Sequence, residues 1–203
     1  MNKSLNNSTT GKRETNKEAN RIKIIESGIE IFSKKGIGDT TVRDIIRNTG
    51  LASGTFYNYF KNKEEVLIAA LDEAAYDLAK ILQKGRKKAN NLEEFIEFQV
   101  DPFFEMVSEL PELFFILSTN LEVVDRFTIQ TPQMTLAIED LKKDLELAIK
   151  NKIIPDVDID YFSTVFTSVI EGVAIEYVSN NKKTDLELAK DFCVNFLVKS
   201  LKN

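Results

Sequence analysis

Apolar side chains recur every three or four residues along most of the chain, from Glu18 to its last residues. Residues at that spacing share one face of an α-helix, so the pattern indicates a succession of amphipathic helices. Only four prolines and eight glycines interrupt the 203 residues, which is too few for a β fold with many turns. The sequence therefore predicts an all-α protein of about nine helices.

Signals that start and stop helices divide the chain into an arm and two helical domains. Residues 1–16 are rich in Asn, Ser, Thr and Lys and lack periodicity, which is typical of a disordered basic and polar arm. Residues 17–61 hold short helical patterns, whereas residues 62–203 hold longer ones. The first long helix, expected over residues 62–84, connects the two domains.

Charge is distributed unevenly between these domains. Residues 1–61 contain 11 Lys and Arg against 6 Asp and Glu, whereas residues 62–203 contain 16 against 26. The net charge of −5 therefore conceals a basic N-terminal third on an acidic body. Such an asymmetry indicates that only the N-terminal part meets a polyanion.

Two residue types that carry much of enzyme chemistry are scarce. The chain has no histidine and one cysteine, Cys193, so the usual zinc ligand sets, an internal disulfide and Ser–His or Cys–His nucleophilic pairs are excluded. Cys193 stands in a helical apolar pattern with Phe192 and Leu197 and is interpreted as a small core residue. We therefore expect no metal, no cofactor and no enzymatic activity.

Nothing in the sequence points to a membrane. No apolar run approaches the ~20 residues needed to span a bilayer, and the polar N-terminal residues do not resemble a signal peptide. The basic residues gather near one segment and do not follow an apolar face, which argues against a protein of the membrane surface. We expect a cytoplasmic protein without a membrane partner.

The segment from Thr41 to Phe60 holds two short helical patterns joined at Gly50. Glycine permits the left-handed backbone that a tight interhelical turn needs, so the segment predicts a helix-turn-helix. Leu51 and the pair Phe56 and Phe60 are interpreted as packing residues. The other residues of the second helix are small, hydroxylated, amide or phenolic, and such groups reach the phosphates and base edges of DNA.

This segment resembles the DNA-binding domain of the tetracycline-repressor (TetR) family. Ala52-Ser53 departs from the family pattern, in which Ser or Lys often precedes the Gly-Thr pair, and this departure concerns operator choice. The resemblance implies an N-terminal three-helix DNA-binding domain followed by a helical ligand-binding and dimerisation bundle. The residues that carry it stand in register as Thr40-Thr41, Ile45, Gly50-Leu51, Gly54-Thr55-Phe56-Tyr57, Tyr59-Phe60, Asn62-Lys63 and Leu67.

The expected DNA contacts fall into two classes. The side chains expected to hold phosphates are Thr41, Arg43, Thr55, Tyr59 and Lys63. The residues expected to face bases are Ser53, Gly54, Tyr57 and Asn58. One contact helix reads only a few base pairs, so useful specificity needs two half-sites about one helical turn apart. We therefore expect a homodimer on a palindromic double-stranded operator.

The last two helices, expected over residues 158–179 and 185–201, are more apolar than one intramolecular face requires. In the family that this chain resembles, these two helices form a four-helix bundle with the partner chain. The dimer contacts expected on this ground are Phe162, Val169, Gly172, Val173, Phe192 and Phe196.

Phenylalanine is concentrated in the middle helices, where seven of the 14 fall between Phe95 and Phe127. This density favours an apolar or aromatic-rich cavity over a pocket for a sugar or a phosphate. We expect a small hydrophobic or aromatic effector that releases a repressor from its operator. The candidate ligand contacts are Phe98, Gln99, Phe104, Phe115, Leu117, Asn120, Phe166 and Glu171.

Other functions of the same fold stay open at this point. An activator, or a regulator that responds to no small ligand, would have the same sequence features. An enzyme with a helical body has little support, because carboxylate pairs such as Glu139-Asp140 are typical of a solvated helix surface.

Overall fold

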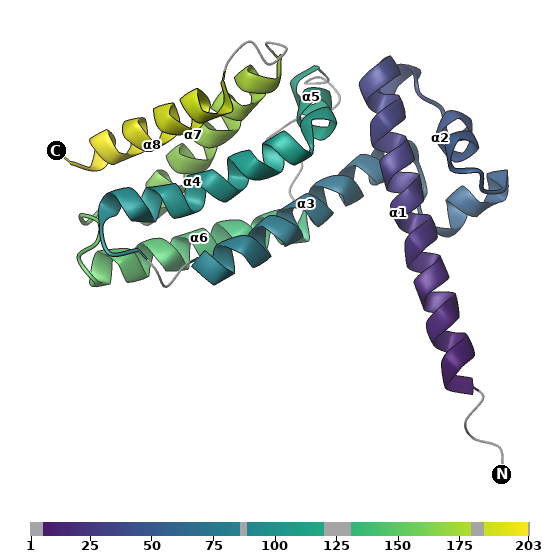
Figure 1. Cartoon of the computed structure of the whole chain (residues 1–203), viewed down its shortest axis with the longest axis horizontal. Coiled ribbons are helices and arrows are strands. Elements are labelled where there is room, and N and C mark those ends of the chain that lie inside the picture. The colour runs from purple at the N-terminus through teal and green to yellow at the C-terminus, as the bar shows by residue number, and fades with distance from the viewer. Residues whose placement is uncertain (1–5, 86–88, 120–130, 180–184, 203) are drawn as a thin grey trace. The chain divides into compact units, whose positions relative to one another are not determined.

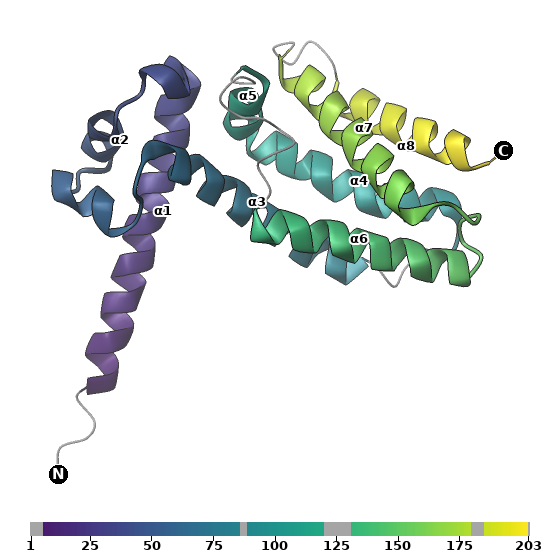
Figure 2. The ribbon, with the colours of Figure 1, turned by 180° about the vertical axis from the view of Figure 1, so that it is seen from behind.

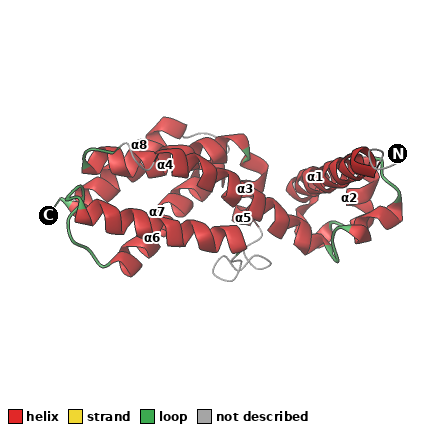
Figure 3. Ribbon diagram, turned by 90° about the horizontal axis from the view of Figure 1, so that it is seen from below, coloured by secondary structure: helices red, strands yellow, loops and turns green. Residues whose placement is uncertain are grey.

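The structure, a computed structural model, describes residues 6–85, 89–119, 131–179 and 185–202. Within these ranges it contains helices and no strand (Figure 3), which confirms the all-α fold class. The helices are α1 (Asn6–Asp39), α2 (Val42–Thr49), the 3-10 helix η1 (Ser53–Asn58), α3 (Lys63–Gly85), α4 (Leu92–Glu109), α5 (Pro111–Thr119), α6 (Pro132–Lys150), α7 (Ile159–Ser179) and α8 (Leu186–Leu201).

The chain divides into two compact units, Met1–Ala70 and Leu71–Asn203. The boundary falls inside α3, whereas the sequence placed it after residue 61. The physical reason is that the first turns of α3 bury Val66 and Leu67, with 0% and 3% of their surface exposed, in the core of the first unit. The rest of α3 belongs to the second unit.

Helix α1 extends further toward the N-terminus than the sequence indicated. It begins at Asn6, so it enters the segment 1–16 for which a disordered arm was predicted. No proline stands in this stretch, and a nucleated helix propagates through residues of modest propensity. The helical path breaks at Gly36, whose φ of 78° and ψ of 159° are not helical.

The core of the first unit is formed by apolar side chains of α1, α2, η1 and α3. The Ser27 hydroxyl crosses from α1 to donate to the Ile45 carbonyl of α2, with 2.7 Å between the oxygens. Gly28 lies so close to α3 that an added Cβ would stand 2.5 Å from Val66 Cγ1. These contacts fix α2 and α3 on α1. The largest fully buried members are Phe32, Phe56, Ile24, Ile37, Ile45, Ile46 and Val66.

The second unit is a helical bundle. Within it α4 packs against α8, α5 against α7, and α7 against both α6 and α8 (Figure 1 and, from behind, Figure 2). Helix α4 continues through Pro102. Cys193 is fully buried in this core, as expected, and burial raises the pKa of its thiol to about 11.

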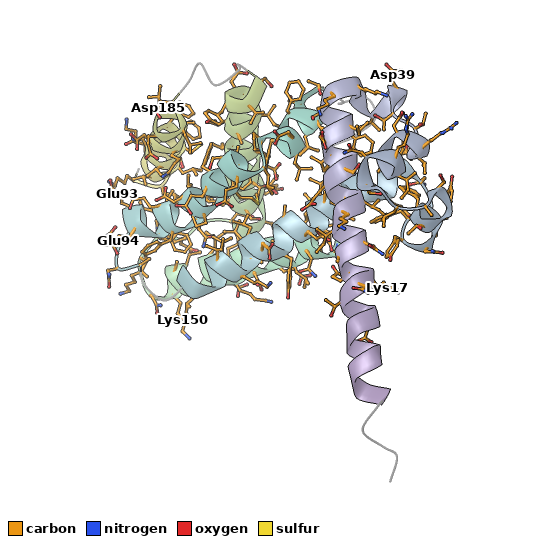
Figure 4. The ribbon with its side chains drawn as sticks, turned by 45° about the vertical axis from the view of Figure 1, so that its right-hand side comes forward. Lys17, Asp39, Glu93, Glu94, Lys150 and Asp185 are labelled. Atoms are coloured by element: carbon orange, nitrogen blue, oxygen red, sulfur yellow. The ribbon has the colours of Figure 1, made fainter. Side chains whose placement is uncertain are left out.

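Charged and polar side chains stabilise the helix ends of the second unit. Asn91 caps α4, and Asp185 caps α8 by accepting from the Glu187 amide. Figure 4 shows Glu93 and Glu94 at the start of α4 and Lys150 at the end of α6, where their charges complement the helix dipole. Thr131 caps α6 directly before Pro132.

Two negative findings concern the described part of the chain only. No helix there is both long enough and apolar enough to cross a membrane. The same residues hold no group of three or more His, Cys, Asp or Glu side chains placed to bind a metal ion.

Candidate functional site

Helix α2 is fixed at both ends by local hydrogen bonds. Thr41 and Asp44 form a reciprocal capping box: the Thr41 hydroxyl accepts from the Asp44 amide, and the Asp44 carboxylate accepts from the Thr41 amide at 3.0 Å. These hydrogen bonds, together with Lys35, lower the pKa of Asp44 to about 2. Gly50 ends the helix in the left-handed conformation at φ 71°, as the turn requires.

The second helix of the motif is a short 3-10 helix, not the α-helix that the spacing suggested. Its i→i+3 bonds run from the Thr55 amide to the Ala52 carbonyl and from the Tyr59 amide to the Phe56 carbonyl, at 2.8 and 2.9 Å. Ala52 is the N-cap and makes no side-chain cap hydrogen bond. Only six residues separate Ala52 from Tyr59, which is too short for a full α-helical ladder.

Side chains of η1 point to opposite environments. Phe56 and Phe60 are buried, with ring centroids 5.9 Å apart, as predicted, while Tyr57 is 65% exposed. An added Cβ on Gly54 would meet no atom of the described chain within 4 Å. This unit thus presents an accessible polar face on a rigid apolar base. The predicted base-facing residues are all exposed on it: Ser53, Gly54, Tyr57 and Asn58.

The residues predicted to hold phosphates differ in their surroundings. Arg43 is exposed, and its guanidinium has no ion pair or hydrogen bond within the described residues. Thr55 and Tyr59 are half-buried at the edge of the exposed face. The Thr41 hydroxyl donates to Asp44 at 2.8 Å and is therefore engaged in the capping box.

Lys63 lies at the start of α3 but its ammonium group points into the domain. It donates to the carbonyl oxygens of Ile37, Gly38 and Thr40, the last two at 2.9 and 2.7 Å. An ammonium group has three N–H donors, so all of them have an acceptor here. Lys63 therefore ties the end of α1 to α3. Its type and its position in the sequence did not reveal this role, because the carbonyls lie more than twenty residues away.

A second candidate site is an apolar cavity of about 200 Å³ inside the second unit. Its walls come from α3, α4, α5, α6 and α7, and most of the lining side chains are aliphatic or aromatic. Polar groups reach it from Gln99, Thr167 and Glu171. The α3 residues among its walls are Leu71, Ala74, Ala75, Leu78 and Leu82.

Half of the predicted ligand contacts line this cavity, namely Gln99, Leu117, Phe166 and Glu171. Phe104 is fully buried in the core, Phe98 and Phe115 are half-buried, and these three do not line it. Asn120 lies outside the described residues. Sequence reasoning missed the walls from α3 and α6, because an apolar stripe that lines a cavity has the same spacing as one that packs a core.

A third feature is an exposed apolar face on α7 and α8. Phe192 and Phe196 are 55% and 47% exposed, and their rings stack with centroids 6.1 Å apart. Gly172 is exposed on α7, while Phe162, Val169 and Val173 are half-buried beside it. Three more exposed apolar side chains lie on these two helices, namely Tyr161, Val165 and Leu188.

Comparison with known proteins places the first unit in a described family. Residues 24–70 match the model of the bacterial regulatory proteins of the tetR family. An uncharacterised HTH-type transcriptional regulator of Haemophilus influenzae is 26% identical to this chain over 108 residues. The match covers 53% of this chain and about half (53%) of that protein. The fatty acid metabolism regulator protein of Bacillus subtilis is 22% identical over 90% of this chain and 95% of its own length.

The fold of the whole chain also has solved counterparts. The transcriptional regulator FadR of Bacillus subtilis, in complex with stearoyl-CoA, superposes with a TM-score of 0.74 at 21% identity. The match covers 89% of this chain and 98% of that protein. At this identity the likeness shows a shared fold.

Proposed function

Because this chain belongs to the TetR family of transcriptional regulators through its N-terminal domain, we propose that it is a repressor released by a small, largely apolar effector. It binds a palindromic operator as a homodimer, in the cytoplasm, where the genome lies. The first unit reads DNA, the cavity of the second unit takes the effector, and the α7–α8 face joins two copies.

The observation that carries this proposal is the division of η1 between buried and exposed side chains. Phe56 is fully buried and holds the backbone, while Tyr57 beside it is 65% exposed. Tyr57 and Asn58 offer donors and acceptors for base edges, and Gly54 leaves room for close approach. Arg43, which has no partner within the described residues, supplies a phosphate contact.

The operator contact requires two copies of the chain. One reading element covers only a few base pairs, so specificity comes from two half-sites about 34 Å apart on one face of the duplex. The exposed Phe192 and Phe196 rings supply apolar area for a two-fold interface, and Gly172 lets helices of two copies approach closely. We therefore assign the dimer interface to α7 and α8.

The effector acts by binding one conformation better than another. A ligand shifts a two-state equilibrium only through its differential affinity for the two states. Helix α3 is the natural connection, because Lys63 at its start holds the end of α1 and Leu78 further along lines the cavity. An effector that displaces α3 would move the DNA-reading unit of each copy out of register with its half-site.

The size of the cavity favours a compact effector. An engineered cavity of about 150 Å³ in another protein takes up benzene, so about 200 Å³ suits a molecule slightly larger than one ring. A long acyl chain is a second candidate, favoured by the Bacillus subtilis relative that was solved with stearoyl-CoA. A long acyl chain would fit only if the walls of the cavity separated.

DNA binding is tested by fluorescence anisotropy on the promoter DNA upstream of the chain's own gene. Replacing Tyr57 by Ala should weaken specific binding by about tenfold to a hundredfold, because a base contact is lost. The circular dichroism spectrum should not change, because the ring is 65% exposed. Tyr76→Ala is the matched control, since Tyr76 is also exposed but lies outside the helix-turn-helix.

Equal binding by Tyr57→Ala and the wild-type protein would contradict the assignment of η1 as the reading element.

The direction of regulation is a separate question that a reporter in a deletion strain answers. Increased expression of the reporter in that strain supports a repressor. Decreased expression would instead indicate an activator of the same fold.

A further inference from the structure

Gln99 is a polar side chain in an apolar environment. It comes from α4, lines the cavity of the second unit and is 93% buried, since only 7% of its surface is exposed. Its one polar contact within the described residues joins Nε2 to Asp144 Oδ2 at 3.5 Å, longer than an ordinary hydrogen bond. The carboxamide oxygen has no donor there at all.

A buried amide whose oxygen has no donor and whose nitrogen has only one long contact destabilises a fold. Its desolvation is not compensated, and an unbranched apolar side chain of similar length, such as methionine, would fill the same space without that cost. Nearly all buried polar groups in proteins have a partner, and an exception calls for a specific explanation. Because the Gln99 amide faces a cavity, a polar atom of a bound molecule is the partner that fits it.

The charges near the Gln99 amide limit which kind of polar atom of a bound molecule can pair with it. Glu171 lines the cavity and Asp144 lies beside the Gln99 amide. The described lining residues include no lysine and no arginine. A carboxylate or a phosphate placed next to Gln99 would therefore lie beside the like charge of Asp144, which is unfavourable.

We propose that the cavity binds a compact apolar molecule that carries one uncharged hydrogen-bonding group, and that this group pairs with the carboxamide of Gln99. This inference rests on the proposed function, which assigns the effector to this cavity. Gln99 is then the residue that distinguishes an alcohol or phenol from a hydrocarbon of the same shape. The remaining apolar walls provide most of the affinity and little of the selectivity.

Calorimetric titration of the full chain at pH 7 tests the proposal with three probes of related shape. The probes are p-cresol, p-xylene, in which a methyl group replaces the hydroxyl, and 4-methylbenzoate, which is an anion. We expect p-cresol to bind roughly tenfold to a hundredfold more tightly than p-xylene, because only p-cresol satisfies the amide. The anion should bind most weakly of the three.

The Gln99→Met variant separates recognition from packing. In this variant the preference for p-cresol over p-xylene should fall to about onefold, since no buried amide remains to be satisfied. The melting temperature of the unliganded variant should stay the same or rise by a few degrees. Gln133→Met is the matched control, because Gln133 is half-buried outside the cavity lining, and it should keep the wild-type preference.

Several results would overturn the inference. These are equal binding of p-xylene and p-cresol, tightest binding of 4-methylbenzoate, no binding of any probe, or a marked fall in melting temperature for Gln99→Met. Binding of p-xylene without any preference would leave the effector cavity of the proposed function in place and remove only the role of Gln99. Operator binding by the unliganded protein is measured separately and does not depend on Gln99.

Discussion

Lys63 and Arg43 are two cations of one domain with opposite surroundings. The Lys63 ammonium donates to three backbone carbonyls, whereas the Arg43 guanidinium is exposed and has no partner within the described residues. Both were expected to contact phosphates. In the structure, Lys63 ties the end of α1 to α3, and Arg43 is exposed to solvent.

This difference predicts opposite results in a salt titration. Each phosphate contact contributes about one unit to the slope of log K against log salt concentration. Arg43→Met should reduce that slope by about one and leave stability unchanged. Lys63→Met should leave the slope unchanged and lower the free energy of unfolding by about 1–2 kcal/mol, because carbonyls of α1 lose a charged donor. A reduced slope in Lys63→Met would show that Lys63 contacts DNA.

At the scale of single residues, the sequence was informative where the immediate neighbours decide the environment. Phe56 and Phe60 were expected to pack and are buried, because their i, i+4 spacing places both on one side. The three carbonyl oxygens that accept from the Lys63 ammonium were not predicted, because they lie in another part of the chain. Gln99 was named as a candidate, but only the structure reveals that its amide makes one long contact, 3.5 Å from Nε2 to Asp144 Oδ2.

At the scale of elements, helix ends were more predictable than helix type. The capping box of Thr41 and Asp44 and the Asn91 cap, which accepts from the Glu94 amide, both join residues three positions apart, so the local sequence encodes them. The 3-10 geometry of η1 was not foreseen. It depends on how Phe56 and Phe60 dock on α1 and α2, which is a tertiary constraint that local propensity does not contain.

The capping box of α2 predicts a pH dependence of stability. The pKa of Asp44 falls from 3.8 to about 2, because the ionised carboxylate accepts hydrogen bonds from Thr41. A lowered carboxyl pKa stabilises the fold above the unfolded pKa, and this stabilisation is lost as the pH falls through the folded pKa. The urea midpoint of the wild-type protein should therefore exceed that of Asp44→Asn at pH 7. This difference in urea midpoint should disappear as the pH falls from 3.8 to about 2.

A gap that persists unchanged at pH 2 would contradict this account, because at that pH the folded carboxyl group is about half protonated and most of the stabilisation is lost. Glu146→Gln, at an exposed position of α6 outside the box, is the control for the general effect of removing one negative charge. If the control and Asp44→Asn had the same urea midpoint at all pH values, the loss of stability would come from the change in net charge and not from the loss of the cap.

At the scale of the whole molecule, the sequence anticipated an all-α chain with a reading unit and a bundle, because helical periodicity persists from end to end. It did not distinguish cavity walls from core. A cavity is a property of the space between helices, and Leu78 and Met134 look like ordinary core residues until α3 and α6 are placed around it. Assembly likewise depends on surfaces that only the folded unit presents.

The exposed face of α7 and α8 leads to the last prediction. Phe192 and Phe196 are about half exposed in the single chain, so glutamate at both positions should leave the fold intact. Two buried carboxylates per copy would oppose an apolar interface, because an unpaired charge is costly to desolvate. The double variant should therefore be a monomer at micromolar concentration by light scattering, while the wild-type protein is a dimer.

The same variant connects assembly to operator binding. A monomer still carries the intact Tyr57 face, so its affinity for a single half-site should equal that of the wild-type protein. Its affinity for the full palindrome should fall by at least about a hundredfold, because the second half-site no longer benefits from a tethered partner. Leu147→Glu, on α6 and 52% exposed, is the control and should remain dimeric. A wild-type monomer at micromolar concentration would remove the basis for reading two half-sites.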